Sequence, residues 1–199
     1  MKPLSISWLA LCFLGSPFFM GTAFSQEKTL VVLDIQELPV KTESLDRSMK
    51  EMIKNVNSII DTFDPENVIY SKAMGQALNI SLKGISITPL PPIAFDSTLA
   101  IVNDKVFTKI EGDAFTEMEF TSFLGPIDSR KIILVGLMAE ECIYKTAIGG
   151  IERGYDITIV SDGIIGKTEK KKEKAIKKMK KKGIEFITME EIDNLLEHP

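Results

Sequence analysis

The chain has 199 residues, of which 44% are hydrophobic and 26% are charged, and these totals fit a single globular domain with a sizeable core. Its 24 basic and 28 acidic side chains give a formal net charge of -4. That balance implies no general affinity for nucleic acid or for an anionic membrane, and it argues against both as partners.

The first 25 residues are predicted to be a secretory signal peptide. Lys2 gives a short positive region, residues 8–20 are mostly apolar, and Ala23-Phe24-Ser25 offers small residues before Gln26. We therefore predict cleavage before Gln26, a secreted or periplasmic protein, and no stable membrane insertion after cleavage. An uncleaved membrane anchor is the alternative, which the short apolar run and its Gly15-Ser16-Pro17 interruption disfavour.

The first predicted strand covers residues 29–34 and ends in Asp34. Its apolar run is continuous rather than alternating, which indicates a strand covered on both faces, as in a parallel sheet. Residues 44–63 have apolar side chains at helical spacing, and residues 68–70 are predicted to form a second short strand. Residues 71–96 hold three prolines and two glycines, and we interpret them as a long irregular loop that covers a site.

The second half of the chain alternates between strands and helices. Residues 98–108 are predicted to form two short extended pieces, followed by Lys109 and then by a short helix over residues 117–124. The expected elements after that are strands at 131–137, 156–160 and 185–188, and helices at 140–153, 168–182 and 189–197. This order predicts an α/β fold with a mostly parallel sheet, and no linker divides residues 26–199 into two domains.

Three reactive side chains fall at predicted strand ends, namely Asp34, Lys109 and Cys142. In open parallel sheets, ligands bind outside the carboxyl ends of the strands. A helix N-terminus and a nearby ammonium group both favour a thiolate, and a carboxylate can carry the thiol proton to a leaving amine. Spacing alone leaves plainer readings open, because a lone cysteine often packs in a core, an aspartate often caps a turn and a lysine is usually solvated.

Three sequence motifs carry a resemblance to a known family. They are residues 30–36 (LVVLDIQ), residues 106–115 (VFTKIEGDAF) and residues 135–143 (VGLMAEECI), in that order along the chain. Together they resemble the isochorismatase-like cysteine hydrolases, which include nicotinamidases and N-carbamoylsarcosine amidases. The resemblance implies the three-layer α/β/α fold of that family, with a mostly parallel, doubly wound central sheet.

The resemblance also implies a catalytic triad and a reaction. Asp34 would be the general acid and base, Lys109 would stabilise the thiolate, and Cys142 would attack an amide or related carbonyl to give a thioester that water hydrolyses. The backbone N–H groups of Met138 and Cys142 would form the oxyanion hole. A cis peptide between Leu137 and Met138 is expected in this turn. One alternative is a non-catalytic binding or scaffold protein of the same fold, against which the complete triad argues. The other is an isochorismatase-type vinyl-ether hydrolase, against which Cys142 argues.

The expected ligands are few. The resemblance implies a small-molecule substrate, and the substrate-pocket candidates are Gln36, Leu38 and Phe115. No cofactor is expected. Nicotinamidases use an Asp and several His as metal ligands, whereas this chain has one histidine, His198, so we predict no metal site.

Two further questions concern larger partners. The helix predicted over residues 168–182, with Lys167 before it, is rich in lysine but lacks interleaved aromatic residues, so we interpret it as a solvated surface helix and not as a nucleic-acid site. A homo-oligomer is left open, because members of the family commonly form dimers or larger assemblies.

Overall fold

The computed structural model describes residues 28–197 with the exception of 39–41, 82–83 and 128–129. The predicted signal peptide, its cleavage site before Gln26 and His198 lie outside the described residues. Among the helices that are described, none combines the length and the apolar character that crossing a membrane requires.

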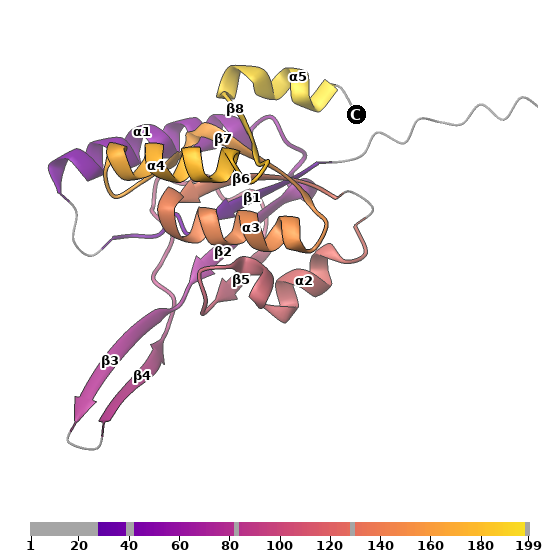
Figure 1. Ribbon diagram of the computed structural model, residues 1–199. Helices are drawn as coiled ribbons and strands as arrows, with labels where there is room; N and C mark the ends of the chain where they lie inside the picture. The colour runs from indigo at the N-terminus through magenta and orange to yellow at the C-terminus, as the bar shows by residue number, and fades with distance from the viewer. Residues whose placement is uncertain (1–27, 39–41, 82–83, 128–129, 198–199) are drawn as a thin grey trace, which may run out of the picture.

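A six-stranded parallel sheet forms the centre of the domain (Figure 1). The chain begins in the middle of it with β1, moves outward to β2 and β5, returns to the other side of β1 with β6, and then continues to β7 and β8. All five neighbouring pairs are parallel. The strands are β1 (Thr29–Leu33), β2 (Val68–Ala73), β5 (Val106–Lys109), β6 (Lys131–Leu137), β7 (Asp156–Ile165) and β8 (Glu185–Ile187).

Helices cover both faces of this sheet, which confirms the predicted doubly wound α/β/α fold. Along β1, Leu30 and Val32 face the core under one helical layer, while Val31 and Leu33 face the core under the other, so the whole strand is buried and its apolar run is continuous. The first layer contains α1 (Glu43–Ile60) and α5 (Ile192–Glu197). The second contains α2 (Met118–Leu124), α3 (Tyr144–Glu152) and α4 (Glu169–Lys180).

Short helical turns connect several of these elements. Three are 3₁₀ helices, namely η1 (Pro65–Asn67), η2 (Ala114–Thr116) and η4 (Met189–Glu191). The fourth, η3 (Ala139–Ile143), is π-helical and leads directly into α3. π-Helical turns are rare and are often found at functional sites.

The prediction of an irregular loop over residues 71–96 is wrong for most of that segment. It contains an antiparallel hairpin of β3 (Gly75–Ser81) and β4 (Gly84–Leu90), which projects from the domain (Figure 1). The prolines concealed it, because proline is normally excluded from central strands. A two-stranded hairpin has an outer edge on each strand, so the missing N–H of Pro89 breaks no essential ladder.

Three strand boundaries also differ from the prediction. β2 runs to Ala73, and only residues 106–109 of the predicted extended pieces form a strand. β7 continues to Ile165 instead of ending at Val160, and its pairing with β6 shifts register between Leu134 and Gly136. The extension brings residue 167 to the same sheet edge as the cysteine.

Gly136 permits a close approach of the two central strands. Its φ is +125°, and a Cβ on it would overlap the backbone carbonyl oxygen of Leu33, the residue opposite it on β1. Any larger residue would be strained and would also push β1 and β6 apart. The two strands lead directly to Asp34 and Cys142, so this glycine sets their separation.

The change Gly136→Ala should lower the free energy of unfolding by about 3 kcal/mol or more, because backbone strain and a steric clash act together. Gly154→Ala is the matched control. Its φ of +80° is also unfavourable, but the nearest atom to an added Cβ is an arginine nitrogen at 3.8 Å. It should lose only about 1 kcal/mol. Urea unfolding measures both values, and equal losses would contradict the close-approach argument.

Candidate active site

Asp34 and Cys142 meet where the direction of strand addition reverses. Asp34 follows β1, and Cys142 follows β6 within η3. These strands are neighbours, and the chain adds strands outward from them in opposite directions. The carboxyl edge of such a switch point is the usual ligand crevice of an open α/β sheet.

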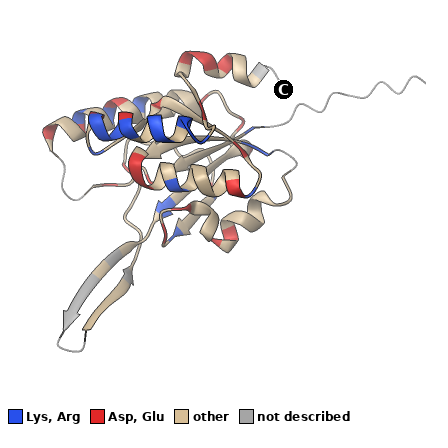
Figure 2. Ribbon diagram, in the orientation of Figure 1, with Lys and Arg blue, Asp and Glu red and all other residues tan. Residues whose placement is uncertain are grey.

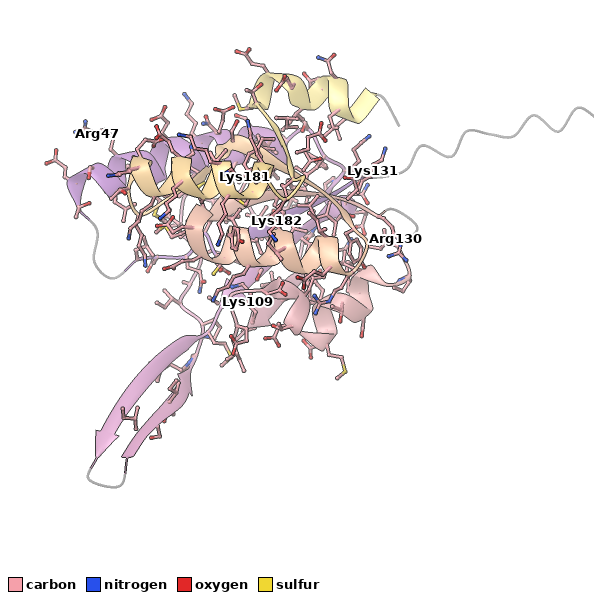
Figure 3. The ribbon with its side chains drawn as sticks, viewed as in Figure 1. Arg47, Lys109, Arg130, Lys131, Lys181 and Lys182 are labelled. Atoms are coloured by element: carbon pink, nitrogen blue, oxygen red, sulfur yellow. The ribbon has the colours of Figure 1, made fainter. Side chains whose placement is uncertain are left out.

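Lys109 reaches the same place from farther away. It is the last residue of β5, which is separated from β1 by β2, and the residue opposite it on β2 is the small Ala73. Its side chain is almost completely buried, and Figure 3 locates it near the point where the hairpin joins the domain. Its Nζ lies 2.7 Å from Asp34 Oδ2 and donates to Cys142 Sγ at 3.3 Å and to the Glu111 carbonyl at 3.2 Å. The ammonium group therefore has two hydrogen-bond acceptors and one ion-pair partner.

The charge of Lys109 is stabilised despite its burial. Burial lowers the pKa of the ammonium group, but the charge of Asp34 and the interactions with Asp34 and Cys142 outweigh burial and raise it above its ordinary value. Lys109 therefore stays protonated at neutral pH.

Asp34 is held in an unusual conformation. Its φ is +58°, in the left-handed region that aspartate tolerates better than most residues, and its N–H donates to the Ser71 carbonyl at 3.0 Å. The contact of Oδ2 with Lys109 is an ion pair that falls outside aligned hydrogen-bond geometry, and Oδ1 has no hydrogen-bond partner among the described residues. A buried carboxylate oxygen without a partner is available to accept a proton or a substrate N–H.

Cys142 lies in the π-helical turn, which the Met138 carbonyl organises by accepting from Glu141 N at 2.9 Å and Ile143 N at 3.3 Å. The preceding peptide bond, between Leu137 and Met138, is cis, the isomer that the resemblance implies.

The thiol of Cys142 is protonated at neutral pH in this site, whereas the resemblance implies a thiolate that Lys109 stabilises. Burial raises the pKa of Cys142 to about 11, and Asp34 raises it further, while Lys109 acts in the opposite direction. The thiolate form is disfavoured because the site already contains one negative and one positive charge. Asp34 and Lys109 already neutralise each other, so a thiolate would add an uncompensated buried negative charge.

A cavity of about 280 Å³ opens above these groups. Its walls are mainly apolar, and an ion pair between Lys167 Nζ and Glu141 Oε1, 2.6 Å apart and half exposed, lies at its rim. The lining residues are Asp34, Gln36, Glu37, Leu38, Ala73, Met74, Gly75, Ile93, Leu137, Met138, Glu141, Cys142 and Lys167.

Gln36 and Leu38, two of the three predicted pocket residues, line this cavity, but the amide of Gln36 is occupied. Its Nε2 donates to the carbonyls of Ala73 at 3.1 Å and Ile93 at 2.8 Å, and its Oε1 accepts from Ala73 N at 2.9 Å. Gln36 thus connects Ala73 and Ile93, which line the cavity, and its amide has few hydrogen-bonding positions left for a substrate.

Phe115 does not line the cavity, and its assignment to the pocket is wrong. The ring is buried in the core under the second helical layer, with ring centroids 5.2 Å from Phe120 and 5.1 Å from Tyr155. The turn at Gly112 directs the chain away from the site after Lys109. Thr146 on α3 fixes that turn, because its hydroxyl accepts from Ala114 N and donates to the Gly112 carbonyl.

Lys167 and Glu141 are the main site residues that sequence reasoning missed. Lys167 follows the end of β7, the neighbour of β6, so the rule of strand ends identifies it once β7 is known to reach Ile165. Its backbone N–H donates to Glu140 Oε1 at 3.1 Å, which holds the turn against η3. In the sequence prediction, Lys167 was grouped with the lysine-rich helix that follows it and was therefore interpreted as a solvated surface residue.

The described residues offer little to a metal ion. They contain no group of three or more His, Cys, Asp or Glu side chains placed to hold one. The nicotinamidase ligands follow the second strand, and here β3 and β4 follow β2 and contain none of these four residue types. The donor set does not fit such a site, and no chemical step below passes through a metal.

Comparisons with known proteins agree with this architecture. The family model for the isochorismatase domain matches residues 28–191. The secreted isochorismatase effector Isc1 of Verticillium dahliae is 26% identical over 153 residues, which cover 72% of this chain and 75% of that protein. Isochorismatase family protein 2A of Dictyostelium discoideum is 25% identical over 174 residues, 86% of this chain and 82% of that protein.

Solved structures share the fold at low sequence identity. An isochorismatase-like hydrolase from Alkaliphilus metalliredigens superposes with a TM-score of 0.68 at 15% identity, covering 86% of this chain and 98% of that one. The pyrazinamidase of Pyrococcus horikoshii, solved in complex with zinc, gives 0.65 at 19% identity, covering 81% and 99%.

The change Asp34→Asn should make the thiol more reactive toward iodoacetamide. Without the carboxylate, the Lys109 ammonium is left beside Cys142 as an unpaired positive charge, which lowers the pKa of the thiol. Each unit of that decrease raises the thiolate fraction at neutral pH about tenfold. Alkylation rates measured against pH should give a midpoint above that of an ordinary thiol for the wild type and a lower one for the variant.

The matched control is Lys109→Met, which removes the positive charge and should slow alkylation at neutral pH. Circular dichroism establishes that each variant is folded. Unchanged or slower alkylation of the folded Asp34→Asn protein would refute the charge-balance argument.

Proposed function

This chain belongs to the isochorismatase family of hydrolases, and we propose that it is a cysteine hydrolase that cleaves a small-molecule amide or a related C–N bond. One observation carries the proposal. The Asp34 carboxylate and the Cys142 thiol both line the cavity, and the buried Lys109 Nζ lies behind them, 2.7 Å from Asp34 and 3.3 Å from Cys142. This is the composition that thiol-based acyl transfer needs: a nucleophile, a base and a group that orients both.

In the proposed reaction, Asp34 takes the proton of the Cys142 thiol as the sulfur attacks the carbonyl carbon of the substrate. The developing oxyanion accepts hydrogen bonds from the backbone N–H groups of Met138 and Cys142. Asp34 then gives the proton to the departing nitrogen, the C–N bond breaks, and a thioester remains on Cys142. Asp34 next removes a proton from water, the resulting hydroxide attacks the thioester, and the thiol is restored with release of the acid.

A neutral resting thiol suits this sequence. Because the thiol starts protonated, Asp34 can transfer the same proton from nucleophile to leaving group. Lys109 stays charged throughout and stabilises whichever of its two neighbours bears the negative charge. The site therefore carries at most one uncompensated charge at any step.

The cavity supports a small substrate. A volume of about 280 Å³ is at the lower end for ligand sites, and apolar walls favour a compact, mostly apolar acyl group. The pair of Lys167 and Glu141 at the rim provides one charge of each sign to orient a polar substituent.

Two other functions compete with this proposal. A non-catalytic binding or scaffold member would not need a buried ion pair against a thiol, which is costly to maintain. An isochorismatase-type vinyl-ether hydrolase would use Asp34 to protonate its substrate and would not need a nucleophile. Replacement of Cys142 therefore separates the amide hydrolase from both.

Cys142→Ser should abolish turnover, with a loss of about a thousandfold or more in kcat, because a serine hydroxyl is a far weaker nucleophile in a site built for a thiol. Ammonia or amine release from a panel of small amides is the measurement. Thr158→Val, which removes a buried hydroxyl near the start of β7, away from the carboxyl edge of the sheet, controls for general damage. Equal rates for Cys142→Ser and the wild type, or no release by the wild type from any amide, would refute the proposal.

We also propose that the protein is exported. The apolar segment after Lys2 and the small residues before Gln26 support this, and a relative of the chain is named as a secreted protein. Protein recovered from the exported fraction should begin at Gln26. A retained Met1 would contradict cleavage.

A further inference from the structure

The charges of this chain are segregated along its sequence. Residues 167–182 contain ten lysines and two glutamates, a net charge of +8, whereas the whole chain has a net charge of -4. The remaining residues therefore carry a net charge of -12. Figure 2 shows the basic side chains as blue segments along α4. The small net charge of the chain thus conceals one strongly basic helix.

Three lysines of this helix line a cavity of about 270 Å³ at the junction of α4 with η3 and the start of α3. They are spaced by three and four residues, so they share one face of the helix. Ala175 on the same face is buried and has only a methyl group, which leaves room for a ligand beside the lysines. The lining residues are Glu140, Tyr144, Lys171, Lys174, Ala175 and Lys178.

The three ammonium groups have no carboxylate partner in the part of the chain that the structure describes. The ion pairs formed there include no lysine of α4. Like charges three and four residues apart on one helix face repel each other and destabilise the helix. A lysine run on a helix usually meets only water, but here three of the lysines line one concave surface. An anion bound among them would offset the repulsion.

Tyr144 holds one of these charges in place. Lys178 Nζ lies 4.2 Å from the centroid of the Tyr144 ring, and the face of an aromatic ring attracts an ammonium group. The ring restricts the side chain of Lys178 without neutralising its charge. Less conformational entropy is therefore lost when this lysine binds an anion.

Glu140 adds one negative charge to the lining, which with three lysines has a net charge of +2. Its carboxylate is engaged elsewhere, because Oε1 accepts from the backbone N–H of Lys167 at 3.1 Å and Oε2 is buried. The cavity therefore favours a ligand that carries at least two negative charges.

We propose that this cavity binds a small soluble ligand that carries two or more phosphate groups. Lysine is a common phosphate ligand, because its compact charge and its three N–H donors suit the several oxygens of a phosphate. A volume of about 270 Å³ lies just below the usual range for drug-sized ligands, which favours a compact ligand such as a diphosphate.

Larger anionic partners fit this surface less well. Single-stranded nucleic acids stack their bases on aromatic rings, and the ring at this cavity, Tyr144, already has Lys178 over one face. A helix that lies on a membrane inserts apolar side chains into the lipid. The apolar side chains of α4 instead face the core, with Ala175 and Met179 buried there and Ile176 packed against it.

The cavity is separate from the active site. The two cavities share no lining residue, although Glu140 lines this one and its neighbour Glu141 lines the other. Binding at the lysines is therefore independent of the proposed hydrolysis, and a binding measurement tests it without turnover.

Isothermal titration calorimetry with inorganic pyrophosphate, in magnesium-free buffer at about 0.15 M salt, tests the site. The wild type should bind one pyrophosphate per chain, and orthophosphate should bind at least about tenfold more weakly, because it carries fewer charges. Lys178→Gln should raise the Kd for pyrophosphate about tenfold or more, because it removes a charge-assisted hydrogen bond.

Lys180→Gln is the matched control. Lys180 also lies over an aromatic ring, with its Nζ 5.6 Å from the centroid of Phe186, but two residues along a helix it faces nearly the opposite side. Its replacement should change the Kd by less than about twofold, since salt screens distant exposed charges. Circular dichroism establishes that both variants are folded.

Three results of the titration would overturn the proposal. They are no binding of pyrophosphate by the wild type, equal weakening by the two lysine variants, which would indicate general attraction to a basic helix, and loss of binding in Cys142→Ser, which would place the anion in the active-site cavity. Flotation with phosphatidylglycerol vesicles distinguishes a lipid headgroup from a free phosphate. A wild type that binds these vesicles but not pyrophosphate would assign the lysines to a membrane surface instead.

Discussion

The site depends on one buried ion pair, between Lys109 and Asp34. A buried pair gains little free energy overall, but removal of one partner costs about 3–5 kcal/mol, because a charge is then left alone in the interior. The fold meets this constraint by bringing the ends of β1 and β5 to one edge, across the small Ala73 at the end of β2. Gly136 brings β6 close on the other side, which adds Cys142 to the same edge.

The same ion pair determines the state of the nucleophile. Because Asp34 and Lys109 cancel each other's charge, the thiol of Cys142 is neutral at rest. In the reaction that we propose, it is activated only as its proton moves to Asp34. This arrangement also protects the enzyme. A lone thiolate is readily oxidised in the oxidising compartments to which we propose the protein is exported, whereas a half-buried neutral thiol is much less reactive.

The sequence predicts the parts of this structure that depend on local pattern. Continuous apolar runs identified β1 and β6 and so located Asp34 and Cys142 at strand ends, and the alternation of elements identified the sheet class. What could not be predicted depends on tertiary contacts. The register shift that extends β7 to Lys167, the core position of Phe115 and the raised pKa of the thiol follow from how segments pack. The hairpin was concealed by Pro89 within β4 and by the two prolines that follow it.

The central claim is that the thiol of Cys142 becomes acylated during turnover. The most direct test is rapid acid quenching during hydrolysis of an activated acyl substrate such as p-nitrophenyl acetate, followed by peptide mass spectrometry. The account predicts an acyl adduct on the peptide that contains Cys142, labile to hydroxylamine as a thioester is, and formed more slowly in Lys109→Met. Substrate hydrolysis without an adduct, or with one on another residue, would contradict it.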